Sequence, residues 1–111
     1  MKNRITFDGN EMTYHLSGEI DHHSARAARE LIDSLIAQKR PAKLRLDFSE
    51  VGFMDSSGIG LIMGRYRMMQ LYGGTVNVVN VPDGQEKIMQ LSGLGALGII
   101  RSKKGEAYEG T

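Results

Sequence analysis

The hydrophobic residues switch between two spacings along the chain, and this switching constrains the fold more than any other feature of the sequence. Met12, Tyr14 and Leu16 recur at every second position, which is typical of a strand with one buried face. From Ala25 to Ile36 the spacing is three or four positions, which predicts an amphipathic helix. Along the whole chain these spacings predict strands at 3–7, 12–20, 43–48 and 75–81, helices at 24–38, 58–72 and 83–93, and a short last strand at 97–100.

Turn residues and the order of the elements indicate how these strands pair. Asp8 and Gly9 separate the first two strands and form a strong signal for a hairpin. The later strands alternate with helices, and such alternation favours parallel neighbours joined by crossovers. The sequence therefore predicts an α/β fold with a mixed sheet. We expect one domain over residues 1–111, with a polar tail from about residue 102.

Composition excludes several classes of protein. The chain has no cysteine, which rules out disulfides, thiolate metal sites and a cysteine nucleophile. Its net charge is +1 and its basic residues are scattered, so nothing indicates nucleic-acid binding. No apolar run approaches the roughly 18 residues of a membrane span, and the first residues do not form a signal peptide. We expect a cytoplasmic protein without a membrane partner.

The two longer helices differ in their predicted contacts. In the first helix one hydrophobic stripe is expected to face the core, and Asp21 or Ser24 can cap its start. This stripe consists of Ala25, Ala28, Leu31, Ile32, Leu35 and Ile36. The second helix is apolar on more than one side. Its main stripe is Ile59, Ile62, Met63, Tyr66 and Met69, and further apolar residues lie off that stripe: Leu61, Met68, Leu71 and Tyr72. It is therefore either buried on both faces or carries a contact surface.

The segment MDSSG, residues 54–58, stands at the start of this second helix and contains the main candidate site. Asp55 or Ser56 is well placed as the N-cap, which explains one polar residue at this point. A catalytic serine would need an oriented base, and the motif lacks the first glycine of the G-x-S-x-G nucleophile elbow. The sequence therefore disfavours a serine hydrolase.

Nucleotide and metal sites are also disfavoured. Gly58, Gly60 and Gly64 do not have the G-x-G-x-x-G spacing, although weak phosphate affinity at the helix start stays open. The polar residues His15, Asp21, His22 and His23 could suggest a metal site. The adjacent histidines are expected to point in different directions, so we expect exposed or capping histidines instead.

Phosphorylation is the remaining possibility for the serine pair. A phosphate on Ser56 would meet free backbone amides and the positive end of the helix dipole. One cap residue is sufficient for the helix, yet three candidates stand in a row at 55–57. On these grounds a plain cap and a cap combined with a phosphorylation switch are equally supported.

Three longer segments resemble a known family. The segments SGEIDHHSA, DFSEVGFMDSSGIGLIMGRY and MQLSGLGALGII are similar to the anti-sigma factor antagonists, above all to their sporulation members, whose fold is the STAS domain. The similarity extends from the first strand to about Arg101. It implies a mixed sheet of four to five strands with helices mainly on one face. Gly95 and Ala96 stand where members of the family often carry bulkier residues.

The resemblance also implies a switch between partners. The unmodified antagonist binds an anti-sigma factor and frees the sigma factor. The anti-sigma factor is also a serine kinase, and it phosphorylates the serine that follows the aspartate of the D-S-S-G motif, which is Ser56 here. A metal-dependent serine phosphatase removes the phosphate. The chain itself would need no catalytic residue, metal or cofactor.

Several residues around Ser56 are expected to contact the partner. Gly58 and Gly60 leave room for its close approach, and Ile59 offers an apolar contact. The full expected surface comprises Asp21, His22, Met54, Asp55, Ser57, Gly58, Ile59 and Gly60. A STAS module that senses a small ligand or nucleotide, or that serves another signalling complex, remains the alternative; the tail of an anion transporter is disfavoured, since no membrane span precedes the domain.

Overall fold

The first two strands form the hairpin that the Asp8-Gly9 turn predicts. In the computed structural model, which describes residues 3–102, Gly9 has a positive φ of 58° between two antiparallel strands. Glycine adopts this conformation easily because it has no Cβ. The elements are β1 (Arg4–Asp8), β2 (Glu11–Ile20), α1 (His22–Lys39), β3 (Lys43–Met54), α2 (Ser56–Leu71), β4 (Thr75–Val81), α3 (Asp83–Leu91) and β5 (Ile100–Ser102), with a 3₁₀ helix at Leu94–Leu97.

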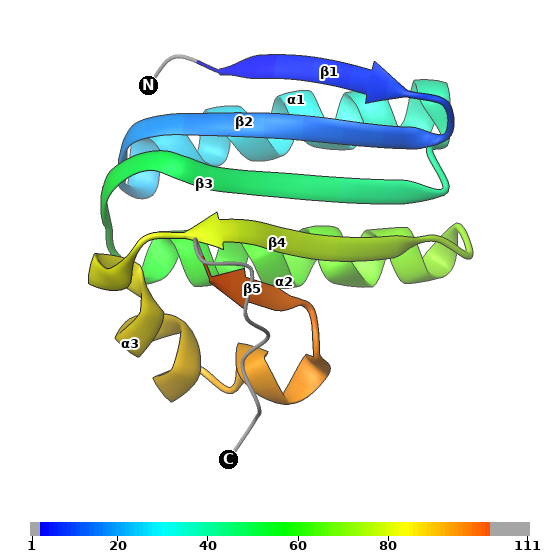
Figure 1. Ribbon diagram of the computed structural model, residues 1–111. Helices are drawn as coiled ribbons and strands as arrows, with labels where there is room; N and C mark the ends of the chain where they lie inside the picture. Colours follow the sequence, from blue (N-terminus) through cyan, green and yellow to red (C-terminus); the bar gives the residue numbers. More distant parts are fainter. Residues whose placement is uncertain (1–2, 103–111) are drawn as a thin grey trace.

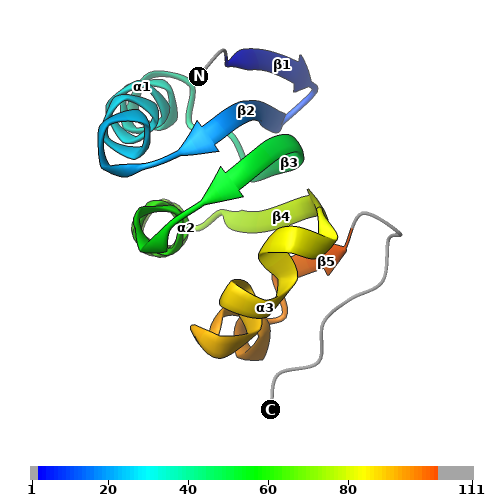
Figure 2. The ribbon, with the colours of Figure 1, turned by 90° about the vertical axis from the view of Figure 1, so that its left-hand side faces the viewer.

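The strands form one mixed sheet in the order β1-β2-β3-β4-β5. β1 is antiparallel to β2, and each later pair is parallel. α1 and α2 lie side by side on one face of this sheet, whereas α3 lies near the β4–β5 end (Figures 1 and 2). The predicted α/β fold, with a mixed sheet, an opening hairpin and helices mainly on one face, is confirmed.

β3 continues six residues beyond its predicted end at Phe48 and reaches Met54. Its pairing with β2 shifts register twice after Asp47, so β3 carries extra residues opposite β2. The buried residues in this part of β3 are Phe48, Val51 and Met54, which are three positions apart. The strand was predicted too short because these bulges replace the spacing of two that identifies a regular strand.

The buried stripe of α1 is narrower than predicted. Ala25, Ala28, Ile32 and Ile36 are buried in the core, and Leu35 packs partly against it. Leu31 is 43% exposed, so its assignment to the stripe is wrong. A residue next to a buried position lies about 100° around the helix and can leave the buried face.

α2 is buried on two sides because it packs against the sheet and against α1. Ile62 and Met69 of the predicted stripe are fully buried, and Leu61, which lies off that stripe, is also buried. Burial on both faces is therefore the correct alternative for most of this helix. Leu71 is 87% exposed at the end of the helix and takes no part in the core.

The C-terminal part differs in detail from the prediction. The residues before the last strand form a 3₁₀ helix, and β5 begins only at Ile100 instead of residue 97. Gly95 is buried in the 3₁₀ helix, whereas Ala96 is exposed. The predicted polar tail beyond residue 102 lies outside the described residues.

Candidate functional site

Ser56 is the first residue of α2 and its side chain is exposed. The helix is capped by the preceding residue, because the Asp55 carboxylate accepts a hydrogen bond of 2.8 Å from the backbone N–H of Ser57. The Gly58 N–H donates to the Asp55 carbonyl at 3.1 Å. Of the two predicted caps, Asp55 is therefore the N-cap. Within residues 3–102 the Ser56 hydroxyl has no hydrogen-bond partner, so the cap leaves it free.

Met54 and Gly58 pack against each other on the buried side of this junction. Met54 is only 6% exposed, and Gly58 is buried directly against it. A Cβ added to Gly58 would overlap Sδ and Cγ of Met54, whereas one added to Gly60 would meet nothing within 4 Å. Glycine at 58 thus permits close packing inside the junction, and of the two glycines only Gly60 is exposed to an approaching partner.

A second junction of the same kind lies beside the first. β2 ends against β3, with Ile20 opposite Met54, and Asp21 caps α1. The Ser24 N–H donates to the Asp21 carboxylate at 2.9 Å, and the Asp21 N–H donates to the Ser24 hydroxyl at 2.9 Å, which makes a reciprocal capping box. The Asp55 N–H donates to the Ile20 carbonyl at 3.1 Å and ties the two junctions together. Asp21 therefore lies at the same edge of the sheet as the Ser56 junction.

The electrostatics of Asp21 follow from this cap. The pKa of its carboxyl is lowered, chiefly because the Ser24 backbone N–H donates to the charged form, with a further contribution from the Ser24 side chain. The carboxylate is exposed, so it can keep its capping bond and still face a partner.

The remaining predicted contact residues fall into two groups. His22 and Gly60 are exposed, while Asp55, Ser57 and Ile59 are half-buried, so all five reach the surface around the junction. Met54 and Gly58, by contrast, are buried and act as its support. His22 and His23 are both exposed, and their rings meet edge to face at 66°, with centroids 5.7 Å apart. They are exposed as expected.

An exposed aromatic residue lies beside the Ser56 junction, and the sequence analysis did not predict it. Phe53 is 53% exposed although it stands in β3 next to the buried Met54. It lies opposite Glu19 of β2, just before both junctions. Its orientation follows from the bulges in β3, which a regular alternation of residues does not reveal.

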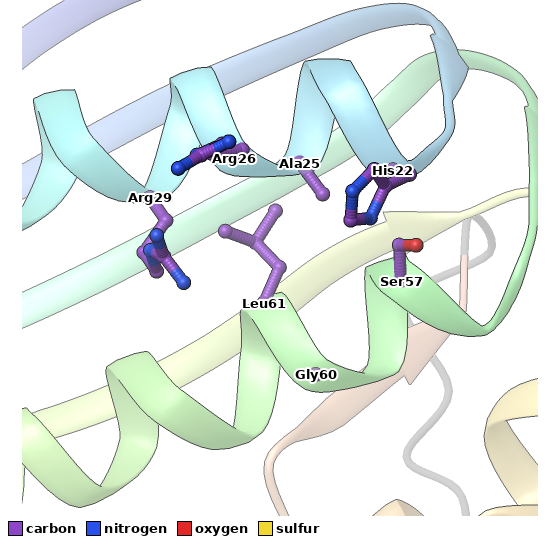
Figure 3. Close-up of a pocket in the computed structure, with 7 residues that line it drawn as sticks. All are labelled: His22, Ala25, Arg26, Arg29, Ser57, Gly60 and Leu61. Carbon is purple, nitrogen blue, oxygen red and sulfur yellow. The ribbon is translucent and has the colours of Figure 1, made fainter.

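A groove between α1 and α2 opens beside Ser57. It has a volume of about 500 Å³, and Figure 3 shows its lining residues. α1 contributes His22, Ala25, Arg26 and Arg29, and α2 contributes Ser57, Gly60 and Leu61. The spacing of Arg26 and Arg29 places them on one helix face, but the sequence did not show that this face borders α2.

An ion pair fixes the distance between the same two helices farther along the groove. Arg65 of α2 is buried, and its Nε lies 2.7 Å from Oδ1 of Asp33 on α1. Its second nitrogen donates to the other Asp33 oxygen at 3.3 Å. The pKa of Arg65 is lowered, chiefly by burial. The carboxylate of Asp33 opposes this shift, and the nearby positive charge of Arg29 adds to it. Asp33 is thus occupied by Arg65, and Arg29 is left without a carboxylate partner among residues 3–102.

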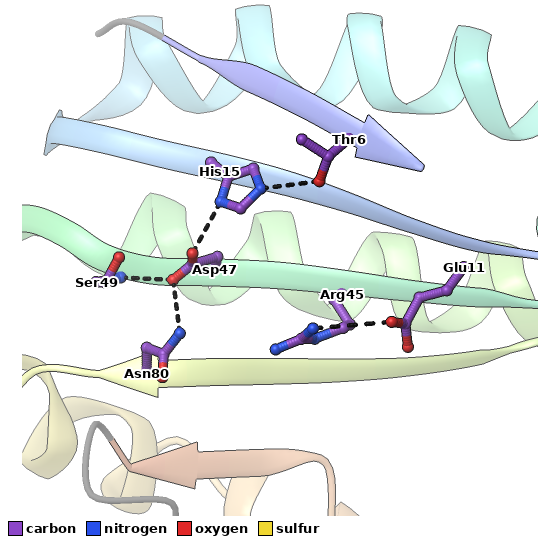
Figure 4. Close-up of polar contacts among 7 residues, drawn as sticks. All are labelled: Thr6, Glu11, His15, Arg45, Asp47, Ser49 and Asn80. Carbon is purple, nitrogen blue, oxygen red and sulfur yellow. Dashed lines mark hydrogen bonds and ion pairs between the residues drawn. The ribbon is translucent and has the colours of Figure 1, made fainter. Parts of the chain in front are cut away.

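The opposite face of the sheet carries a separate polar cluster, which Figure 4 shows. His15 Nδ1 lies 2.8 Å from Asp47, and its other ring nitrogen lies 3.0 Å from Thr6. Asp47 also accepts from Asn80 at 3.1 Å and from the Ser49 N–H at 2.9 Å. Burial acts to raise the pKa of Asp47, but these hydrogen bonds together lower it. His15 is thus half-buried and hydrogen-bonded, so the expectation of an exposed or capping residue is wrong for His15.

No group of three or more histidine or acidic side chains within residues 3–102 is arranged to hold a metal ion. None of the helices in that part of the chain is long and apolar enough to cross a membrane.

Comparison with known proteins places this geometry in a family. The profile of the STAS domain matches residues 3–107, which include both junctions and the groove. The chain belongs to the STAS-domain family. An anti-sigma F factor antagonist of Paenibacillus polymyxa is 37% identical over 79 residues, which cover 71% of this chain and 68% of that protein. An anti-sigma-B factor antagonist of Bacillus subtilis is 32% identical over 85 residues, covering 77% and 76%.

Solved structures of STAS proteins include two states of one antagonist. The anti-sigma factor antagonist SpoIIAA in its unphosphorylated form matches this STAS domain with a TM-score of 0.81 at 29% identity, covering 91% of this chain and 87% of that one. The phosphorylated form of SpoIIAA from Bacillus matches with a TM-score of 0.74 at 29% identity, covering 91% and 90%. One fold therefore matches both forms.

Proposed function

We propose that this STAS protein is an anti-sigma factor antagonist that is switched off by phosphorylation of Ser56. In its unmodified form it binds an anti-sigma factor, which then releases its sigma factor. The anti-sigma factor also acts as a serine kinase that transfers phosphate from ATP to the Ser56 hydroxyl. A metal-dependent serine phosphatase returns the chain to its active form.

The exposed hydroxyl of Ser56 carries this proposal. A kinase must bring the acceptor oxygen into its own active site, so the acceptor has to stand free of the protein surface. Ser56 meets this requirement, because Asp55 caps the helix in its place and Met54 and Gly58 support the turn from inside. The names of the relatives support the anti-sigma factor as the partner.

A phosphate at this position is compatible with the fold. It adds about −1.5 to −2 charges at neutral pH. The helix dipole favours negative charge at the start of α2, whose first turn carries no acidic residue. The N-cap Asp55 repels the phosphate, but in the free protein water and salt screen this repulsion because Ser56 is exposed. The match of both SpoIIAA forms to one fold supports a modification that leaves the backbone in place.

The same phosphate would act against the complex. Pressed between two protein surfaces beside Asp55, it loses hydration and meets a like charge. Each 1.4 kcal/mol of such cost is a factor of ten in affinity, so we expect a loss of roughly a hundredfold or more. Ser56→Asp should weaken binding less, because it carries one charge and fewer oxygens.

The test is a phosphorylation assay with purified partners. The chain is incubated with ATP, Mg²⁺ and either an anti-sigma F factor or an anti-sigma-B factor, which are the targets that the relatives' names specify. The proposed function predicts an intact-mass increase of one phosphate with at least one of them, and none for Ser56→Ala. Nucleotide binding by the chain alone, without phosphorylation or complex formation, would instead favour a ligand sensor.

A further inference from the structure

The groove between α1 and α2 has an uneven distribution of charge. Arg26 and Arg29 stand on the α1 wall, and none of the lining residues within 3–102 is acidic. Arg26 reaches Glu30 at 3.7 Å, but both side chains are about two-thirds exposed, and such pairs are weak. Arg29 has no ion-pair partner within residues 3–102. The groove therefore presents positive charge that the rest of the described chain leaves largely uncompensated.

The floor of the groove and its α2 wall differ from the positively charged α1 wall. Ala25 and Leu61 form an apolar floor, and Gly60 on α2 leaves the wall open. Figure 3 shows Arg29 extending from α1 toward α2, and His22 facing Ser57 at the end of the groove nearest the switch. A small anion is usually held by donors that converge from several sides, whereas the charged donors here line one wall. An open groove with one charged wall and an apolar floor fits a polypeptide better.

We propose that this groove binds an acidic segment of the anti-sigma factor, with Arg26 and Arg29 holding its carboxylates and an apolar side chain of the segment resting on Ala25 and Leu61. The inference rests on the proposed function and adds the chemistry of the partner. The groove ends at Ser57, the neighbour of the phosphate acceptor. A segment bound there places the anti-sigma factor beside Ser56.

The position of the groove links binding to the switch. A phosphate on Ser56 adds its negative charge next to the end of the groove, where it repels an acidic segment. Release of the partner then requires no movement of α1 or α2. Part of the effect of the phosphate should consequently disappear when the arginines no longer hold the segment.

The experiment measures the affinity of the anti-sigma factor that phosphorylates the wild-type chain in the assay above. The groove variant is Arg26→Gln/Arg29→Gln. The matched control is Arg4→Gln/Arg67→Gln, which removes the same charge from exposed positions outside the groove. Thermal unfolding of both variants verifies that they are folded. We expect the groove variant to bind about tenfold to a hundredfold more weakly than the control at low salt.

Two further measurements sharpen the result. The difference between the two variants should shrink as salt rises from about 0.05 M to about 0.3 M, because salt screens exposed charges. Ser56→Asp should lower the affinity by a smaller factor in the groove variant than in the wild-type chain. Arg26→Lys/Arg29→Lys, which keeps both charges, should recover much of the binding.

Three outcomes would overturn the inference. Groove and control variants that bind within about twofold of each other show that the arginines do not hold the partner. Saturable binding of inorganic phosphate in the groove, with unchanged affinity of the groove variant for the anti-sigma factor, assigns the groove to a small anion. Failure of the wild-type chain to bind any anti-sigma factor overturns the proposed function, and this inference with it.

Discussion

The β2–α1 and β3–α2 junctions contain the same types of residue, but their serines make different hydrogen bonds. In each, a strand ends beside the other strand, an aspartate caps the following helix, and a serine stands near the helix start. At α1, the Ser24 hydroxyl accepts from the Asp21 N–H and donates to the Glu19 carbonyl, both at 2.9 Å. At α2, the Ser56 hydroxyl has no such partner within the described residues.

This difference separates a structural serine, Ser24, from the serine that we propose is regulatory, Ser56. A hydroxyl engaged in a capping box stabilises the helix and is unavailable to another protein. A hydroxyl released from capping adds little to stability and is free for modification. An aspartate caps both helices, so the difference lies in position: Ser24 is the third residue of α1 and completes the capping box, whereas Ser56 is the first residue of α2 and takes no part in its cap. The following predictions test that distinction.

The largest expected effect is on phosphorylation. Ser56→Ala should abolish it and leave the stability of the fold almost unchanged, because the side chain makes no hydrogen bond in residues 3–102. Ser24→Ala should do the opposite, with normal phosphorylation and a loss of about 1 kcal/mol in the free energy of unfolding. Intact mass and urea unfolding measure the two effects. Mapping of the phosphate to Ser57 in the wild-type chain would contradict the assignment.

The next effect concerns the packing of Gly58 against Met54 at the Ser56 junction. Gly58→Ala should lower the free energy of unfolding by about 1–3 kcal/mol, because the new Cβ overlaps the buried Met54 side chain. Gly60→Ala is the matched control in the same helix, where nothing lies within 4 Å of an added Cβ. It should be neutral or stabilise by up to about 1 kcal/mol, since alanine favours helix. Equal stability of the two variants in urea unfolding would show that Gly58 is not required for packing.

A smaller effect separates capping from docking at Asp21. Asp21→Ala should cost about 1 kcal/mol of stability, whereas Asp21→Asn should cost little, because asparagine caps as well as aspartate. Both should weaken binding of the anti-sigma factor, since we propose that the charge of Asp21 contributes to docking. Urea unfolding and titration with the partner measure the two properties. Normal binding by Asp21→Asn would leave Asp21 with the capping role alone.

The smallest effect is on the acid dependence of stability. The folded-state pKa of Asp21 is lowered, so its stabilising contribution is present above the unfolded value of about 3.9 and is lost as pH falls through the folded value. Between about pH 5 and pH 3, wild-type protein should therefore lose slightly more stability than Asp21→Asn. Asp47 also has a lowered pKa, but it is present in both proteins and cancels in the comparison. Parallel curves of unfolding free energy against pH would contradict the prediction.

Local sequence patterns were sufficient for most of the fold, whereas Ser56 as the phosphate acceptor was implied by the family resemblance and stays a prediction. The hairpin follows from Asp8-Gly9, and α1 follows from its helical spacing. Local signals also narrowed the cap of α2 to Asp55 or Ser56, and the structure assigns it to Asp55. These features depend on residues that are close together in the chain, and their signals are accordingly strong.

Features that depend on distant residues could not be predicted in the same way. The end of β3 and the exposure of Phe53 result from bulges against β2, which appear only when both strands are paired. The groove exists because α1 packs against α2, and the Asp33–Arg65 pair that joins them spans 32 positions. An arginine on a helix face indicates nothing about its neighbour until the two helices are placed side by side.

The central claim is that phosphate on Ser56 acts locally, at a junction that already tolerates it. Backbone amide chemical shifts of the phosphorylated and unmodified protein test this claim most directly. The account predicts changes confined to residues 53–64, the neighbouring Asp21 and the side of α1 that lines the groove, with the far half of α1 and the distant strands unchanged. Shifts spread through all of α1, β1 and β4 would mean a global conformational switch and would contradict the account.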